Sequence, residues 1–136
     1  MMRKYIPFIL FFCLTISFFA CSEKDDNLSE RLVGAWQLTS ININNQQQDL
    51  SGKNEMILFT ETFVFKRYLS DEDKYRIGGW NIKADMLNIS LDLPSAYYIE
   101  VLNSTELSLK RLDFETDGSL KTTIINYQKV SEDLLP

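Results

Sequence analysis

The hexapeptide Met86-Leu87-Asn88-Ile89-Ser90-Leu91 decides the fold class, because apolar and polar side chains alternate along it from Leu87 onward. A period of two places the leucines and the isoleucine on one face of an extended strand, with Asn88 and Ser90 on the other face. Such strands belong to antiparallel sheets with one buried and one solvated face. Residues 97–101 and 106–110 repeat the pattern, so the chain is predicted to be all-β.

The same alternation, interrupted by polar turn-like clusters, predicts eight strands after Leu32. They are expected at residues 34–43, 55–60, 62–69, 74–82, 86–92, 97–102, 106–113 and 120–129. Consecutive strands joined by short turns favour an eight-stranded antiparallel up-and-down barrel, which leaves no exposed edge. A β-sandwich is the alternative. Asn27 ahead of residues 28–31 predicts one short N-terminal helical turn.

The first twenty residues indicate an export signal, because Arg3 and Lys4 precede an apolar run that ends at Cys21. A helix that spans a bilayer needs about 20 apolar residues, whereas this run covers only residues 5–20. A basic start, a short apolar centre and a small residue before the cut are the parts of a cleaved signal. Residues 1–20 are therefore predicted to be a signal peptide rather than a transmembrane anchor or a core helix.

Ala20 and Cys21 resemble the end of the bacterial lipobox, whose cysteine receives diacylglycerol before cleavage. Phe18 stands where that motif usually has leucine, and Phe19 is bulkier than usual. The resemblance implies that lipid on Cys21 attaches the protein to a membrane through more than one acyl chain. Residues 21–29 would then form a lipidated, acidic and flexible tether. It resembles tethers of outer-membrane lipoproteins of the Gram-negative cell envelope, either surface-exposed or facing the periplasm.

Composition excludes several classes of function. The chain has 14 basic and 19 acidic residues, a net charge of −5, and loss of Arg3 and Lys4 with the signal leaves 12 − 19 = −7. Nucleic acid binding needs clustered basic residues, so no nucleic acid partner is expected. The chain has no histidine, which removes the commonest general base and metal ligand. We therefore expect no catalytic residue, cofactor or metal site, and predict that the protein is not an enzyme.

Cysteine usage points to a domain held together by its hydrophobic core. The cysteines are Cys13, inside the predicted signal, and Cys21, the predicted lipidation site. The folded domain is therefore expected to have neither a disulfide nor a thiolate zinc site. The acidic run 71–73 lacks the glycine and glutamate spacing of a calcium-binding loop, so it is predicted to be a hairpin turn.

Several motifs in residues 30–130 resemble the small bacterial lipocalin-like lipoproteins of the calycin group. They are Leu32-Val33-Gly34-Ala35-Trp36, Leu38, Phe59, Phe63, Phe65, Gly79-Trp80-Asn81-Ile82, Leu87 and Ile89. The resemblance implies one lipocalin-like barrel over residues 30–130, followed by a C-terminal tail at 131–136. It also implies that Gly34 and Trp36 lie at the closed end of the barrel. Lys129 is the basic residue nearest to the place where lipocalins put an arginine over that tryptophan.

The function depends on whether side chains fill the barrel or leave room for one small ligand. The residues expected to point inward are mostly large, which favours a filled interior. They are Trp36, Leu38, Phe63, Phe65, Trp80, Ile82, Leu87, Ile89, Tyr97, Ile99, Val101, Leu107, Leu109 and Ile124. If a cavity exists, we expect its lining to come from Phe63, Phe65, Trp80, Leu87, Ile89, Tyr97 and Ile99. No charged residue is expected at its mouth, and the polar residues 44–49 are predicted to be a solvated loop, which the resemblance places across the open end as a lid.

A hollow barrel and a filled barrel predict two different functions. The first is a membrane-anchored, non-enzymatic protein that binds a small apolar or amphipathic ligand in its barrel. The alternative is a surface or periplasmic interaction module with a filled barrel, whose loops contact a protein or a glycan. A cavity of a few hundred Å³ would favour the first function. A packed barrel with an exposed apolar patch would favour the second.

Overall fold

The computed structural model describes residues 27–135. The predicted signal peptide, Cys21 and most of the predicted tether lie outside the described residues. Within residues 27–135, neither helical segment has the length and apolar content that crossing a bilayer requires.

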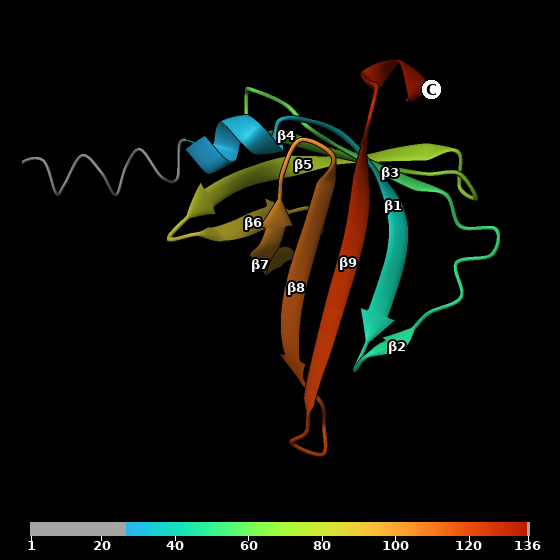
Figure 1. The fold of residues 1–136 in the computed structure, drawn as a ribbon, viewed down its shortest axis with the longest axis vertical. Helices are drawn as coiled ribbons and strands as arrows, with labels where there is room; N and C mark the ends of the chain where they lie inside the picture. The colour runs from blue at the N-terminus through green and yellow to red at the C-terminus, as the bar shows by residue number, and fades with distance from the viewer. Residues whose placement is uncertain (1–26, 136) are drawn as a thin grey trace, which may run out of the picture.

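Eight antiparallel strands form a closed barrel (Figure 1). They are β1 (Gly34–Ile43), β3 (Glu55–Phe59), β4 (Val64–Leu69), β5 (Lys74–Lys83), β6 (Met86–Ser90), β7 (Pro94–Leu102), β8 (Glu106–Phe114) and β9 (Leu120–Val130). Each strand pairs with the next, and β1 also pairs with β9 from Ala35–Val130 to Ile43–Thr123. This last pairing closes the sheet. The predicted eight-stranded up-and-down barrel is confirmed, and the sandwich alternative is excluded.

One short strand in the polar loop was not predicted. β2 (Gln46–Gln47) pairs with Asn42 and Ile43 at the end of β1. Asn44 and Asn45 make the turn with φ values of 50° and 66°, a left-handed conformation that asparagine tolerates well and that tight two-residue hairpin turns require. Residues 44–47 are exposed, as a solvated loop would be, but the hairpin was missed, and the Asn-Asn pair was the signal for it.

Two short helical segments lie near one end of the barrel (Figure 1). The predicted N-terminal helix is present at residues 27–32, where Leu28 packs against the core and Leu32 is fully buried. The 3-10 helix η2 (Glu132–Leu134) lies within the predicted tail, and the Ser131 side chain caps it by accepting a hydrogen bond from the Asp133 backbone N–H. The segment that precedes β1 and the segment that follows β9 therefore lie at the same end of the barrel.

A β-bulge and the strand register change which residues point inward. The bulge between Ile99 and Val101 interrupts the alternation along β7. Beyond it, Leu102 packs against the core, whereas Val101 is 40% exposed. On β9, Ile125 packs against the core, so its neighbour Ile124 points to the outer face. The inward placement predicted for Val101 and Ile124 is wrong.

The apolar core fills the half of the barrel nearest the helices. Its largest members are aromatic: the Phe59 ring lies 5.2 Å from Phe65 and 5.3 Å from Trp80, in tilted and edge-on contacts. Trp36 is fully buried, and its Nε1 donates to the Leu32 carbonyl at 2.9 Å. This packing joins the N-terminal helix to the barrel and closes that end.

Lys129 covers Trp36 at the closed end. Its Nζ lies 4.6 Å from the centre of the indole ring and donates to the Val33 carbonyl at 2.8 Å. Partial burial lowers the pKa of Lys129 from its ordinary value. Gly34 has a φ of 133°, and a Cβ at this position would lie 2.6 Å from Lys129 Nζ. The lysine therefore occupies space that is open only because residue 34 is glycine.

We expect Gly34→Ala to lower the free energy of unfolding by about 2 kcal/mol or more, because it strains the backbone and displaces Lys129 from Trp36. Gly118→Ala is the matched control, since Gly118 also has a positive φ, of 85°, but has open space around its Cβ position. Urea unfolding of the two variants measures the difference. A loss for Gly34→Ala no larger than that for Gly118→Ala would contradict this account of the closed end.

Candidate functional site

A cavity of about 320 Å³ lies inside the barrel, toward the open end opposite the helices. Seven of the eight barrel strands contribute to its wall, all except β5. The lining residues are Ile41, Glu55, Ile57, Phe65, Arg67, Ile89, Leu91, Leu93, Ser95, Tyr97, Leu109, Arg111, Ile125 and Tyr127. The prediction of a filled interior is therefore wrong for this half of the barrel. Its volume is at the lower end of the range for small-molecule sites.

The cavity is partly polar, which the sequence analysis missed. Glu55, Arg67 and Arg111 belong to its wall, so the prediction of a mouth without charged residues is wrong. Each arginine follows an inward apolar residue by two positions, Arg67 after Phe65 and Arg111 after Leu109. Continuing the alternation to the strand ends would have placed both guanidinium groups inside.

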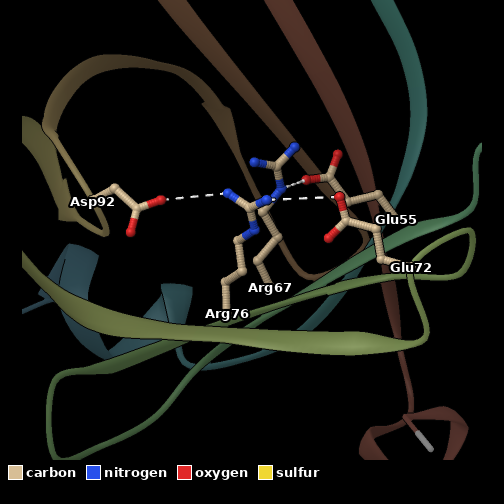
Figure 2. Close-up of polar contacts among 5 residues, drawn as sticks. All are labelled: Glu55, Arg67, Glu72, Arg76 and Asp92. Carbon is tan, nitrogen blue, oxygen red and sulfur yellow. Dashed lines mark hydrogen bonds and ion pairs between the residues drawn. The ribbon is translucent and has the colours of Figure 1, made fainter.

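Glu55 and Arg67 form an ion pair in the wall between β3 and β4 (Figure 2). Glu55 is only 9% exposed, and Arg67 Nε donates to its Oε1. Because the pair uses Nε, the two terminal nitrogens of Arg67 lie outside it. Burying the Glu55 carboxylate costs desolvation free energy that the ion pair only partly recovers, because the Arg67 side chain is itself 36% exposed. Stability alone therefore does not account for a charged pair at this place.

Arg111 is the second cation of the cavity. Its Nε lies 2.9 Å from Asp113 Oδ2, on the same strand. The hydrogen bond to Asp113 is the main cause that raises the pKa of Arg111 above its ordinary value; burial opposes it, and a hydrogen bond to the Tyr97 side chain adds to it. Asp113 does not belong to the cavity lining. Arg111 and Tyr97 thus present a cation and a hydroxyl side by side on β8 and β7.

Tyr127 contributes a neutral hydroxyl group to the same wall. Burial, and next the negative charge of Glu55, raise the pKa of Tyr127 well above its ordinary value of 10.0. The side chain therefore stays protonated at physiological pH and is available as a hydrogen-bond donor. Among the residues that line the cavity, the formal charges are those of Arg67, Arg111 and Glu55, which sum to 2 − 1 = +1.

A third arginine stands at the open end. Arg76 is directly opposite Arg67 in the β4–β5 ladder, so both side chains leave the sheet on the same face. Arg76 lies 3.6 Å from Glu72 in the β4–β5 turn and 3.4 Å from Asp92 in the β6–β7 turn (Figure 2). These pairs are exposed and contribute little to stability. They do hold Arg76 between two turns of the open end.

A second hollow of about 410 Å³ lies between the barrel and the loop of residues 48–54. We call it the vestibule. Ile41, Glu55 and Arg67 line both the vestibule and the cavity. The Glu55–Arg67 pair therefore stands between the two spaces. Of the segment 44–49 that the family resemblance implied as a lid, Gln48 and Asp49 line the vestibule.

The predicted lining residues fall into three groups. Phe65, Ile89 and Tyr97 line the cavity. Leu87 is fully buried in the core, and Ile99 packs against it. Phe63 and Trp80 lie instead at the closed end, where they line an outer groove of about 540 Å³.

Local backbone geometry explains the position of Phe63. It has a φ of 63° in the β3–β4 turn, and its carbonyl accepts from the Trp80 backbone N–H at 3.1 Å. The ring is 51% exposed and lies against Trp80 from outside, with ring centres 5.2 Å apart. The groove beside it is bounded by the N-terminal helix, this turn and Trp80 of β5.

Comparison with known proteins agrees with this geometry. The family model for the lipocalin-like domain matches residues 32–109. A structure of bovine odorant binding protein in complex with a selenium-containing odorant is 17% identical over 78% of this chain and 74% of that chain, with a TM-score of 0.50. Bovine odorant binding protein complexed with its natural ligand is 18% identical over 76% of each chain, with a TM-score of 0.48. No curated protein matches this chain in sequence. The first of these structures supports the same barrel fold, and the family match shows that the chain belongs to the lipocalin-like domain family.

Proposed function

We propose that this protein is a non-enzymatic, membrane-anchored binding protein that holds a small amphipathic or apolar ligand inside its barrel. The cavity of about 320 Å³ is the observation that carries the proposal. Small-molecule sites are concave and mostly apolar, with a few convergent polar groups that orient the ligand. This cavity has that composition, because isoleucines, leucines and Phe65 surround Arg67 and Arg111.

Family membership supports the same function. Lipocalin-like barrels are typically ligand-binding, and the bovine odorant binding protein that shares this fold has an odorant bound in its structure. The larger groove near Phe63 and Trp80 is a less suitable site. It lies outside the barrel, where a ligand keeps more of its contact with water and gains less from burial.

The alternative function, contact with a protein or a glycan through loops, has one supporting observation. Phe114 and Leu120 face each other at the tip of the β8–β9 hairpin and are 82% and 49% exposed. This hairpin extends beyond the other strands at the open end (Figure 1). The filled barrel that this alternative assumed is absent, so we rank it second.

Membrane attachment through lipid on Cys21 would orient the mouth. The described chain begins at residue 27 at the closed end, where Leu28 packs against the core. Six residues, 21–26, would separate the lipid from this end, and a chain of that length spans at most about 20 Å. The closed end would then face the membrane, and the mouth would open away from it. The site would then be within reach of molecules outside the lipid.

Filling the cavity tests the binding function. We expect Ile125→Trp to lower the bound fraction about tenfold or more, because the indole would occupy space that the ligand needs in a cavity of about 320 Å³. Ile77→Trp is the control, because Ile77 is 65% exposed on the outside of the barrel. The readout is native mass spectrometry of the full-length protein after gentle purification and incubation with cell lipid extract. The absence of any bound small molecule from the unsubstituted protein would overturn the proposed function.

The lipid anchor is tested separately in bacteria that express the full-length chain. We expect Cys21→Ser to abolish incorporation of labelled fatty acid, because the thiol is the proposed attachment point. Cys13→Ser removes the other cysteine of the chain and should leave labelling unchanged. Intact mass measurement would show whether residues 1–20 are removed. Labelling of Cys21→Ser at the level of the unsubstituted protein would exclude this anchor.

A further inference from the structure

We infer that the barrel cavity is selective for a small amphipathic monoanion, with a carboxylate-like head beside Arg111 and Arg67 and an apolar chain toward the core. The inference rests on the proposed function and names the class of ligand for that site. It comes from the charge, donors and size of this cavity.

The charge of the cavity is opposite in sign to that of the protein. The lining carries Arg67 and Arg111 against Glu55, a sum of +1, whereas the whole chain carries −5. A negative surface accounts for solubility but gives no reason for an excess of positive charge inside the barrel. In a partly enclosed site, a charge interacts more strongly than at the surface. A ligand with one negative charge balances this excess, and a cationic ligand increases it.

The donors of the cavity suit an oxyanion. Guanidinium groups offer planar, forked sets of N–H donors that match carboxylate geometry. Arg67 uses Nε for Glu55, and Arg111 uses Nε for Asp113. Arg111 also bonds to the Tyr97 side chain, but a guanidinium group has five N–H donors, so both arginines keep donors for a ligand without breaking either ion pair. The hydroxyl groups of Tyr97 and Tyr127 line the same space and add donors for a second oxygen.

The existing partner of Arg111 does not cancel its attraction for a ligand. The Asp113 side chain is 38% exposed and stands outside the lining, and exposed ion pairs are worth about 0–1 kcal/mol. Glu55 cancels more of the attraction of Arg67 for a ligand, because this carboxylate is nearly buried. We therefore assign the larger share of anion binding to Arg111.

The apolar part of the site sets the ligand's length. Ile89, Leu109 and Ile125 line the cavity together with Phe65 and both arginines, so one ligand can touch both kinds of surface. At about 30 Å³ for each water-sized group, a volume of about 320 Å³ holds roughly ten heavy atoms. An eight-carbon carboxylate has this size, so n-octanoate is a suitable probe, with n-octanol as its uncharged counterpart.

Titration calorimetry of the full-length protein with the two probes tests the inference. We expect n-octanoate to bind at least tenfold more tightly than n-octanol, because a hydrogen bond to a charged group is worth about 1.5–3 kcal/mol. Arg111→Gln should weaken n-octanoate about tenfold and leave n-octanol unchanged. Lys110→Gln makes the same charge change on the next residue of β8, whose side chain pairs with Glu100 outside the cavity, and should change neither affinity.

The possible results distinguish a failure of anion selectivity from a failure of the proposed function. Equal affinities for the two probes, or a tighter n-octanol, would overturn anion selectivity while leaving a ligand-binding barrel. An equal loss of n-octanoate in Arg111→Gln and Lys110→Gln would also overturn it, because the effect would then be a general one of net charge. The unchanged n-octanol affinity expected for Arg111→Gln guards against a folding defect, because a variant with a damaged barrel would lose both probes. Failure of both probes and of the lipid extract described above would overturn the proposed function as well.

Discussion

The pairing of β1 with β9 is the constraint on which the rest of the structure depends. It runs from Ala35–Val130 at one end of the barrel to Ile43–Thr123 at the other, and it joins the first barrel strand to the last. Closure converts an open meander into a barrel with an enclosed interior. It also brings Lys129 over Trp36, which seals one end, and places Tyr127 and Ile125 in the wall of the cavity.

The interior that this closure creates has two unlike halves. Near the helices, Trp36, Phe59 and Trp80 are packed tightly and almost without exposure, as expected for a core that must stabilise the fold without disulfides. Toward the mouth, Glu55, Arg67, Ser95 and Arg111 on β3, β4, β7 and β8 line the interior, and a cavity remains. The tightly packed core and the proposed binding site are thus separated along the barrel axis. The apolar half provides rigidity, and the polar half provides a site whose side chains are held by strands rather than by loops.

Much of the fold was predictable because its signals are local. Alternation along residues 86–91 and the turn clusters between strands predicted all eight barrel strands, most within three residues of their observed bounds. The errors arose where a non-local effect intervened. A bulge moved Val101 outward, and a left-handed backbone placed Phe63 outside the barrel. The site was less predictable. Only apolar residues were expected to point inward, because arginines are mostly exposed in proteins. In addition, no sequence pattern shows that Arg67 contacts Glu55 or that Arg111 contacts Tyr97.

The central claim is that a small anionic ligand enters the open half of the barrel, and the most direct measurement is methyl NMR of the isoleucines during titration with n-octanoate. Ile41, Ile57, Ile89 and Ile125 line the cavity, whereas Ile77 is exposed on the outside of the barrel. The account predicts that the cavity methyl signals shift together and saturate at one equivalent, while the Ile77 signal does not move. Shifts confined to Ile77, or no saturable shift of the cavity methyl groups, would contradict it.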